Sequence, residues 1–373
     1  NGNKKKQLLS IQIAEAKINL KLETDNDGKA EFQFPAKLML WSPENPKLYQ
    51  VKIIGETDSI TESIGFRNIE VKGTEILLNG KACFLKGVNL HEEIPQRKGR
   101  AYSESDALQL LTWAKELGCN FVRLAHYPQN EHIVRMADKM GLMLWEEIPV
   151  YQGIAFSDTI IQAKMNSFLS EMISRDKNRC NIIIWSMSNE TSPGKARNEC
   201  IINMANLARR LDPTRLIASA FDKNSYIGNT VTINDTLSKY LDVLSVNEYL
   251  GWYKPWPCNP EEVVWKSDFN KPLIMSEFGG EALYGNHGPA DTASSWSEEY
   301  QEQLYKDQLA MFKKIPFLRG TCPWILVDFR SPGRLHPLYQ DGQKGMWNRK
   351  GLLSDKGYKK KAWYVMEKYY RSF

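Results

Sequence analysis

The feature that most constrains the fold is a series of short apolar runs between residues 84 and 326, with helical stretches between most of them. The runs are apolar throughout rather than alternating, which is typical of strands buried on both faces of a parallel sheet. Eight such strands, alternating with helices over roughly 290 residues, predict an α/β fold of the (β/α)8 TIM barrel type. A doubly wound open sheet is the alternative, but no glycine-rich phosphate loop follows the first run. The eight runs are 84–89, 120–125, 142–147, 181–188, 215–220, 242–247, 272–277 and 320–326.

Three of the intervening stretches, 103–118, 130–141 and 297–314, have the 3.6-residue period of amphipathic helices. Ser103 or Ser105 is expected to cap the start of the first helix, and Gly141 is expected to end the second. These boundaries agree with the barrel assignment.

The first 75 residues follow a different pattern. Alternating segments between residues 8 and 71 are separated by turn signals at 25–28 and 43–46, which predicts a small antiparallel β-sandwich. We therefore expect a β-sandwich in residues 1–75 and a catalytic barrel in residues 76–373. The sandwich has few strands and the chain starts at Asn1–Gly2, so we expect a piece of a longer protein whose targeting segment lies outside this sequence.

Charge and hydropathy argue against two classes of partner. The chain carries 49 basic and 44 acidic residues, mixed along its length, and only 4–6 and 359–361 are basic runs. This distribution does not favour a nucleic-acid partner. No apolar run reaches the roughly 18 residues of a membrane span, so no membrane partner is expected. The sequence leaves open whether the protein forms a homo-oligomer. It also leaves the compartment open between the bacterial periplasm and the cytoplasm.

The residues that follow the predicted strands suggest the chemistry, because a TIM barrel carries its active site at the carboxyl ends of its strands. These positions are rich in carboxylates and aromatic rings. There is no G-x-S-x-G sequence and no suitably placed cysteine, which argues against a Ser or Cys nucleophile. His91, Glu92 and Glu147 could converge, but their spacing fits no known metal-ligand set. We expect no metal or other cofactor, and the six cysteines show no disulfide or zinc spacing.

Glu190 and Glu277 follow the fourth and seventh runs, on different sides of an eight-strand ring. Two carboxyl groups that flank a small substrate are the requirement for glycoside hydrolysis. Retention of configuration needs them about 5–5.5 Å apart, one as nucleophile and one as acid/base. The nearby aromatic side chains suit a sugar, so we predict a carbohydrate substrate.

At this point long segments resemble glycoside hydrolase family 2, and within it the β-glucuronidases. WSPENPKLY and SIGFRNIEV are similar to the immunoglobulin-like domain of that family, and LLNGKACFLKGVNLHEE to the start of its barrel. IIIWSMSNE resembles its acid/base motif and LIMSEFGGE its nucleophile motif. The resemblance covers nearly the whole chain and implies a retaining exo-β-glycosidase that hydrolyses terminal β-D-glucuronides.

The resemblance also implies roles for individual residues. Glu277 would be the nucleophile that forms a glycosyl-enzyme, and Glu190 the acid/base. Asn189 would bind the sugar 2-hydroxyl, a contact that strengthens in the transition state. Arg123 and Tyr249 would hold the nucleophile ionised and correctly aimed.

Further positions would form the sugar subsite. His91 and Trp324 would line it, with Tyr253 as a wall residue or as simple packing. Asn348 and Lys350 match the N-x-K motif with which β-glucuronidases read the sugar carboxylate, and charge-assisted hydrogen bonds there are roughly twice as strong as neutral ones. Because some galactosidases of the family carry similar strings, a β-galactosidase is the alternative.

Two departures from the family keep other hypotheses open. The N-terminal sugar-binding jelly roll is missing, so the fragment could be inactive without it, or the barrel could bind carbohydrate without catalysis. The stretch 329–346 is longer than expected and could form a rim, in which Arg330, Arg334 and Lys344 would assist an anionic substrate. Glu146 and Glu147 are expected to be structural, and His126 to orient a loop.

Overall fold

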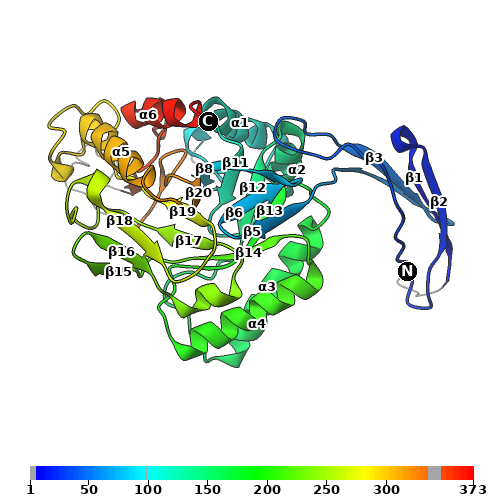
Figure 1. Ribbon diagram of the computed structural model, residues 1–373. Helices are drawn as coiled ribbons and strands as arrows, with labels where there is room; N and C mark the ends of the chain where they lie inside the picture. The colour runs from blue at the N-terminus through cyan, green and yellow to red at the C-terminus, as the bar shows by residue number, and fades with distance from the viewer. Residues whose placement is uncertain (1–5, 98, 335–345) are drawn as a thin grey trace.

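The computed structural model describes residues 6–97, 99–334 and 346–373, and within them the predicted strands form a parallel barrel (Figure 1). The strand order is β14-β13-β12-β11-β8-β20-β19-β17. A bridge between Phe221 and Val246 joins the two ends, with Phe221 N donating to Ser245 O at 2.9 Å. The TIM barrel prediction is confirmed. The strands are β8 (Leu85–Leu90), β11 (Phe121–Leu124), β12 (Met143–Glu147), β13 (Ile182–Asn189), β14 (Leu216–Ala220), β17 (Leu244–Asn247), β19 (Leu273–Glu277) and β20 (Leu318–Thr321).

The continuous apolar runs are explained by two cores on the two faces of this sheet. Along β12, Met143 and Trp145 point into the barrel, whereas Leu144 packs outward in the layer shared with the helices. Burial of each large apolar side chain contributes about 1.5–3 kcal/mol, so both faces stabilise the fold. The eighth strand differs from the prediction: it ends at Thr321, and residues 322–326 form no strand.

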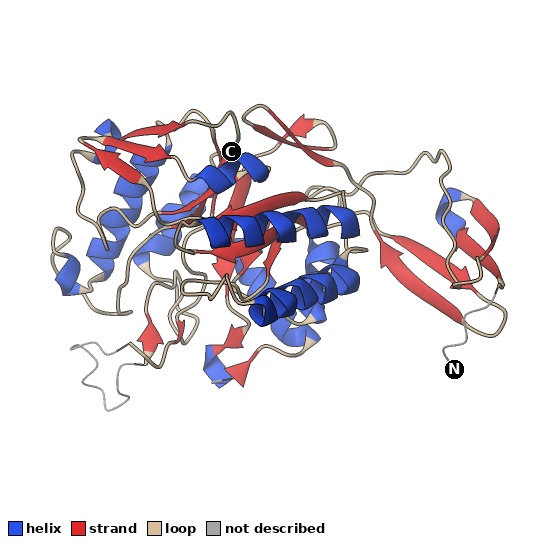
Figure 2. Ribbon diagram, turned by 90° about the horizontal axis from the view of Figure 1, so that it is seen from below, coloured by secondary structure: helices blue, strands red, loops and turns tan. Residues whose placement is uncertain are grey.

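The helices surround the sheet, as Figure 2 shows. Ser103 caps α1 by accepting from Asp106 N, and the Asp106 side chain accepts from the Ser103 backbone in return. Gly141 ends α2 with φ 69°, the left-handed conformation that glycine adopts most easily. Both predicted caps are therefore present. The helices are α1 (Glu104–Glu116), α2 (Glu131–Met140), α3 (Thr159–Asp176), α4 (Lys195–Leu211), α5 (Glu298–Phe312) and α6 (Lys361–Tyr370).

Two consecutive crossovers, from β14 to β17 and from β17 to β19, carry β-structure and short 3-10 turns in place of an α-helix. After β14 the chain forms β15 (Ser225–Ile227) and β16 (Thr230–Ile233), and β18 (Val264–Ser267) joins them in a three-stranded sheet. This sheet lies beside the barrel at one side of its wall (Figure 1). None of the helices in the described part of the chain is long and apolar enough to cross a membrane.

The N-terminal sandwich-type domain stands away from the barrel (Figure 1). Its sheet, in the order β2-β1-β3-β4, contains β1 (Leu8–Ile13), β2 (Ile18–Glu23), β3 (Tyr49–Ile54) and β4 (Ser59–Ile64). The alternating segment 30–36 forms no strand, contrary to its pattern. Phe32 and Phe34 are exposed there, because no neighbouring strand among the described residues pairs with this segment.

A second small sheet closes the bottom of the barrel. It consists of β5 (Ile69–Lys72), β6 (Glu75–Leu78) and β7 (Lys81–Ala82), and Ile69 and Ile76 pack against the inner core. Arg67, which precedes β5, binds the start of β13 by donating to the carbonyl oxygens of Cys180 and Ile182. The boundary predicted between residues 75 and 76 falls inside this sheet and stays a prediction.

Candidate active site

Asn247, at the end of β17, contacts the carboxyl of Glu190 and the residue that precedes Glu277. Asn247 Nδ2 donates to Glu190 Oε1 at 2.9 Å, and Asn247 Oδ1 accepts from Ser276 Oγ at 2.7 Å. Ser276 precedes Glu277 in β19, and Asn247 pairs with Glu277 in the sheet register. The barrel therefore places Glu190 and Glu277 around a common point at its mouth.

Glu277 is held by a donor on each carboxylate oxygen. Arg123 Nη1 lies 2.8 Å from Oε1, and Tyr249 OH lies 2.7 Å from Oε2. Burial, together with the charges of Glu277 and Glu190, raises the pKa of Tyr249 well above its usual range, so its hydroxyl keeps the proton that it donates. The two donors fix the direction of the carboxylate.

Glu147 in turn fixes the guanidinium of Arg123. Arg123 Nε and Nη2 lie 3.0 and 3.1 Å from Glu147 Oε2 and Oε1, and Trp145 Nε1 donates to Oε2 at 2.8 Å. Burial opposes ionisation, but the neighbouring Arg123 and His126 lower the pKa of Glu147 to about 2. Glu147 is thus an ionised carboxylate whose hydrogen bonds to Arg123 and Trp145 hold the guanidinium in place.

Glu146 points to the other side of β12. Its carboxyl is buried beneath α3, and its Oε1 lies 3.7 Å from Arg175 Nη2. Burial and the adjacent Asp176 raise the pKa of Glu146 well above its usual range. Glu146 therefore packs as a neutral carboxyl outside the barrel, whereas the neighbouring Glu147 lies inside it beside Arg123.

Glu190 has the surroundings of a proton donor. Burial and the neighbouring Glu277 raise the pKa of Glu190, because both disfavour a second negative charge. Its backbone has φ 51°, a left-handed conformation that is uncommon for a residue with a Cβ and is found at active sites. A carboxyl whose pKa is raised by its surroundings can act as a general acid at a pH where an unperturbed carboxyl is ionised.

Asn189 is oriented by two donors. Its Oδ1 accepts from Arg123 Nη2 at 2.7 Å and from Asn247 Nδ2 at 3.0 Å. Since the oxygen is occupied, the amide nitrogen is the group available to a ligand. Within the described residues, this Nδ2 makes no protein hydrogen bond.

Aromatic and imidazole rings form one wall beside Glu277. The His126 and Trp324 rings are stacked with centroids 4.9 Å apart, and His91 meets Trp324 edge to face at 5.3 Å. Burial and the proximity of His126 lower the pKa of His91 to about 3, so His91 is neutral. His126 Nε2 lies 3.9 Å from Glu277 Oε1, closer to the site than a loop-orienting role implied. Its position three residues after Arg123 was the available sequence signal.

At another edge of the site, a buried cation is flanked by Tyr253. Lys350 Nζ lies 2.6 Å from Tyr253 OH and 3.0 Å from Glu281 Oε1, and Lys350 N donates to Asn348 Oδ1 at 3.1 Å. Arg334 donates to Tyr253 OH at 3.0 Å and also pairs with Glu281. Burial opposes the shift, but Lys350 and Arg334 lower the pKa of Glu281. Sequence reasoning missed Glu281, although it closes the LIMSEFGGE segment.

The two described basic residues of the predicted rim lie in different surroundings. Arg334 joins this cluster, whereas Arg330 is exposed and its backbone N contacts Glu93 at 3.3 Å. Lys344 lies outside the described residues.

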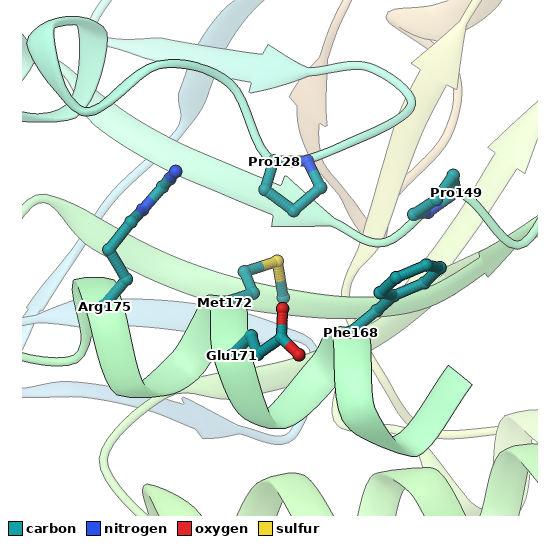
Figure 3. A pocket seen from close by; sticks show the side chains of 6 residues that line it. All are labelled: Pro128, Pro149, Phe168, Glu171, Met172 and Arg175. Atoms are coloured by element: carbon teal, nitrogen blue, oxygen red, sulfur yellow. The ribbon is translucent and has the colours of Figure 1, made fainter. Parts of the chain in front are cut away.

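A cavity of about 380 Å³ opens at the mouth beside Glu190 and Asn247. Its remaining lining is Asp222, Lys223, Asn224, Tyr226, Tyr249, Tyr253 and Lys254. A second cavity, of about 310 Å³, lies between α3 and the segments after β11 and β12 and contains none of the predicted site residues (Figure 3). Across the described ranges, no group of three or more His, Cys, Asp and Glu side chains is arranged to hold a metal ion.

Comparisons with known proteins agree with this architecture. Residues 69–342 match the model of glycosyl hydrolases family 2, TIM barrel domain, and residues 2–67 match that of glycosyl hydrolases family 2. A β-glucuronidase from Paenibacillus borealis is 27% identical over 83% of this chain and 54% of its own length. The pig (Sus scrofa) β-glucuronidase is 28% identical over 92% of this chain and 54% of its own length. The chain thus spans about half the length of the curated relatives it matches.

A solved structure resembles the whole chain. It is a family 2 β-galacturonidase from Eisenbergiella tayi bound to galacturonate, 27% identical, with a TM-score of 0.83. The likeness covers 100% of this chain and 68% of that protein. The barrel and the preceding β-domain are therefore shared.

Proposed function

The chain belongs to glycosyl hydrolase family 2, and on that premise we propose that it hydrolyses terminal β-D-glucuronides with retention of configuration. The observation that carries the proposal is the arrangement of two carboxyls with different hydrogen-bond partners at the mouth of the barrel. One is held by Arg123 and Tyr249, and the other, Glu190, is surrounded by groups that favour its protonated form.

In the first half of the proposed reaction, Glu277 attacks the anomeric carbon. The bond from that carbon to the leaving-group oxygen breaks, and Glu190 gives its proton to that oxygen. A covalent glycosyl-enzyme on Glu277 results. Because Glu277 is then esterified and neutral, the charge that disfavoured ionisation of Glu190 is gone.

In the second half, Glu190 acts as a base. It takes a proton from water, the water oxygen bonds to the anomeric carbon, and the ester bond to Glu277 breaks. The sugar is released with its original configuration, and both carboxyls regain their starting states. Asn189, with its amide nitrogen available, binds the 2-hydroxyl throughout.

Specificity for a uronic acid is supported by the cluster around Lys350. Lys350 and Arg334 carry two positive charges against the single negative charge of Glu281, so the cluster has a surplus of one positive charge. A sugar carboxylate would neutralise it, whereas the neutral hydroxymethyl group of a galactoside would not. Asn348 and Tyr253 add neutral polar groups at the same place.

The test is a side-by-side assay of the aryl β-glucuronide, β-galacturonide, β-galactoside and β-mannoside. We expect the glucuronide to have the highest kcat/KM. A preference for the galactoside would overturn the carboxylate assignment, and the galacturonide measures how the site reads the C4 hydroxyl. If this chain hydrolyses none of the four substrates, the same assay is repeated with a longer form of the protein. Activity of the longer form would show that part of the site lies outside these residues.

A further inference from the structure

Glu248 lies between the predicted nucleophile and one of its two hydrogen-bond donors, and the proposed reaction does not use it. It follows Asn247 at the end of β17 and precedes Tyr249, and its side chain is fully buried. We propose that Glu248 is a positioning residue: it holds Tyr249 where the Tyr249 hydroxyl can donate to Glu277. The inference rests on the proposed function, because it needs Glu277 as the nucleophile.

Glu248 contacts both the nucleophile and the donor. Its backbone N donates to the carbonyl oxygen of Glu277 at 2.9 Å, which joins the two residues where their strands end. Its side-chain Oε1 accepts from the backbone N of Tyr249 at 3.0 Å. The Tyr249 hydroxyl in turn donates to Glu277 Oε2 at 2.7 Å. These three hydrogen bonds form a closed circuit that starts and ends at the nucleophile.

Donors from neighbouring segments hold the Glu248 carboxylate in place. Tyr226 OH donates to Oε2, Asn224 Nδ2 lies 3.4 Å from the same oxygen, and Lys254 Nζ lies 3.2 Å from Oε1. Burial and the charge of Glu248 raise the pKa of Tyr226 well above its usual range, so its hydroxyl keeps the proton that it donates. Since Tyr226 belongs to β15, the crossover after β14 anchors the carboxylate from which Tyr249 takes its position.

The influence of Glu248 on the reaction has to pass through Tyr249. Tyr249 lines the cavity beside Glu190, whereas Glu248 is not among the described residues that line it. A buried backbone N–H without an acceptor is costly, so loss of Glu248 Oε1 would favour a shift of the Tyr249 backbone toward another partner. A hydrogen bond weakens steeply as its geometry departs from the optimum. Such a shift would therefore weaken the bond from the Tyr249 hydroxyl to Glu277.

The test is a double-mutant cycle on kcat with the 4-nitrophenyl β-glucuronide. Glu248→Gln keeps the size of the side chain but replaces one acceptor oxygen by an amide nitrogen. That nitrogen must face one of two donors, Tyr226 OH or Tyr249 N, so one hydrogen bond is lost. The substitution is made in the parent and in the Tyr249→Phe background.

Asp212→Asn is the matched control. Asp212 is also a buried carboxylate that accepts from a backbone N, that of Thr214 at 3.0 Å, and pairs with an arginine, Arg215, at 2.9 Å. It precedes β14 and so lies at the amino end of that strand, away from the mouth of the barrel. It therefore reproduces the change in chemistry without the contact to Tyr249.

We expect Glu248→Gln to lower kcat by about tenfold in the parent and by less than about twofold in the Tyr249→Phe background. The second loss is small because the hydroxyl through which Glu248 acts is already absent. Asp212→Asn should leave kcat within about twofold of the parent. Equal losses in the two backgrounds, as a purely structural role would give, or no loss in the parent, would overturn the positioning role.

Tyr226→Phe decides the question if Glu248→Gln does not fold. Tyr226 is 39% exposed, and its substitution removes a donor from Glu248 Oε2 while the backbone N of Tyr249 keeps its acceptor. We expect kcat to fall by about threefold in the parent and to stay unchanged in the Tyr249→Phe background. No loss, or the same loss in both backgrounds, would overturn the proposal. Failure of the parent chain on every glucuronide would instead count against the proposed function.

Discussion

Arg123 Nη1 lies 2.8 Å from Glu277 Oε1, and the Arg123 side chain has no exposure to solvent. A buried ion pair of this kind is strongly directional, and removal of either member leaves an uncompensated charge. Arg123 also donates to Asn189 and Glu147, so one guanidinium orients the predicted nucleophile and the amide that would bind the substrate. The proposed catalytic groups thus share a single rigid support.

Glu277→Gln is the direct test of the nucleophile. We expect turnover of a nitrophenyl β-glucuronide to fall by at least about a hundredfold, because the amide cannot form the glycosyl ester. Glu146→Gln is the matched control, since Glu146 is also a buried carboxyl at a strand end but lies outside the barrel. Steady-state kinetics of both variants would reject the assignment if Glu277→Gln stayed within tenfold of the parent.

The raised pKa of Glu190 predicts the basic limb of the pH profile. The protonated form is the acid, so kcat/KM should decline as the pH rises through this raised pKa. Glu190→Gln should lose about 10²–10⁴ in kcat/KM on a poor leaving group, and much less in kcat/KM on a dinitrophenyl glycoside, whose leaving group needs no protonation.

The pH profile of Glu190→Gln on the dinitrophenyl substrate provides the check. Its basic limb should be absent, because the group that titrates there has been removed. An unchanged basic limb would assign the titration to another residue.

Lys350→Ala tests recognition of the carboxylate. Loss of a charge-assisted hydrogen bond costs about 1.5–3 kcal/mol, so kcat/KM on the glucuronide should fall by about ten- to a hundredfold. The galactoside should lose far less, because it has no charge at that position. Lys356→Ala removes a cation from the same C-terminal segment and is the control. Equal losses on the two substrates would contradict the role.

Tyr249→Phe tests the second donor on Glu277. The Tyr249 hydroxyl donates to Glu277 Oε2 at 2.7 Å, and its removal leaves a buried carboxylate oxygen without that donor, at a cost of about 1–3 kcal/mol. We expect a reduction in kcat of about ten- to a hundredfold.

Tyr305→Phe is its control. The Tyr305 hydroxyl is fully buried with no hydrogen bond among the described residues, so its loss should leave kcat unchanged and the thermal midpoint equal or higher. A Tyr249→Phe variant as active as Tyr305→Phe would show that the hydroxyl does not support the reaction.

The sequence alone was sufficient for the barrel and its helix caps. Strands buried on both faces must be apolar throughout, and a serine or glycine at a helix end acts through its own backbone neighbours. Both signals are local, and both appear in the printed sequence. The segment 30–36 shows the limit, because alternation predicts a strand only where a partner strand is available.

The tertiary structure decided which acidic and basic side chains contact one another. Glu146 and Glu147 are adjacent in the sequence, yet one carboxyl enters the barrel and binds Arg123, and the other lies beneath α3. Alternation along a strand separates them by face, but which face is the barrel interior depends on closure of the sheet. Glu281 gains its significance from its contacts with Lys350 and Arg334, which lie in distant segments, and no spacing in the sequence encodes such proximity.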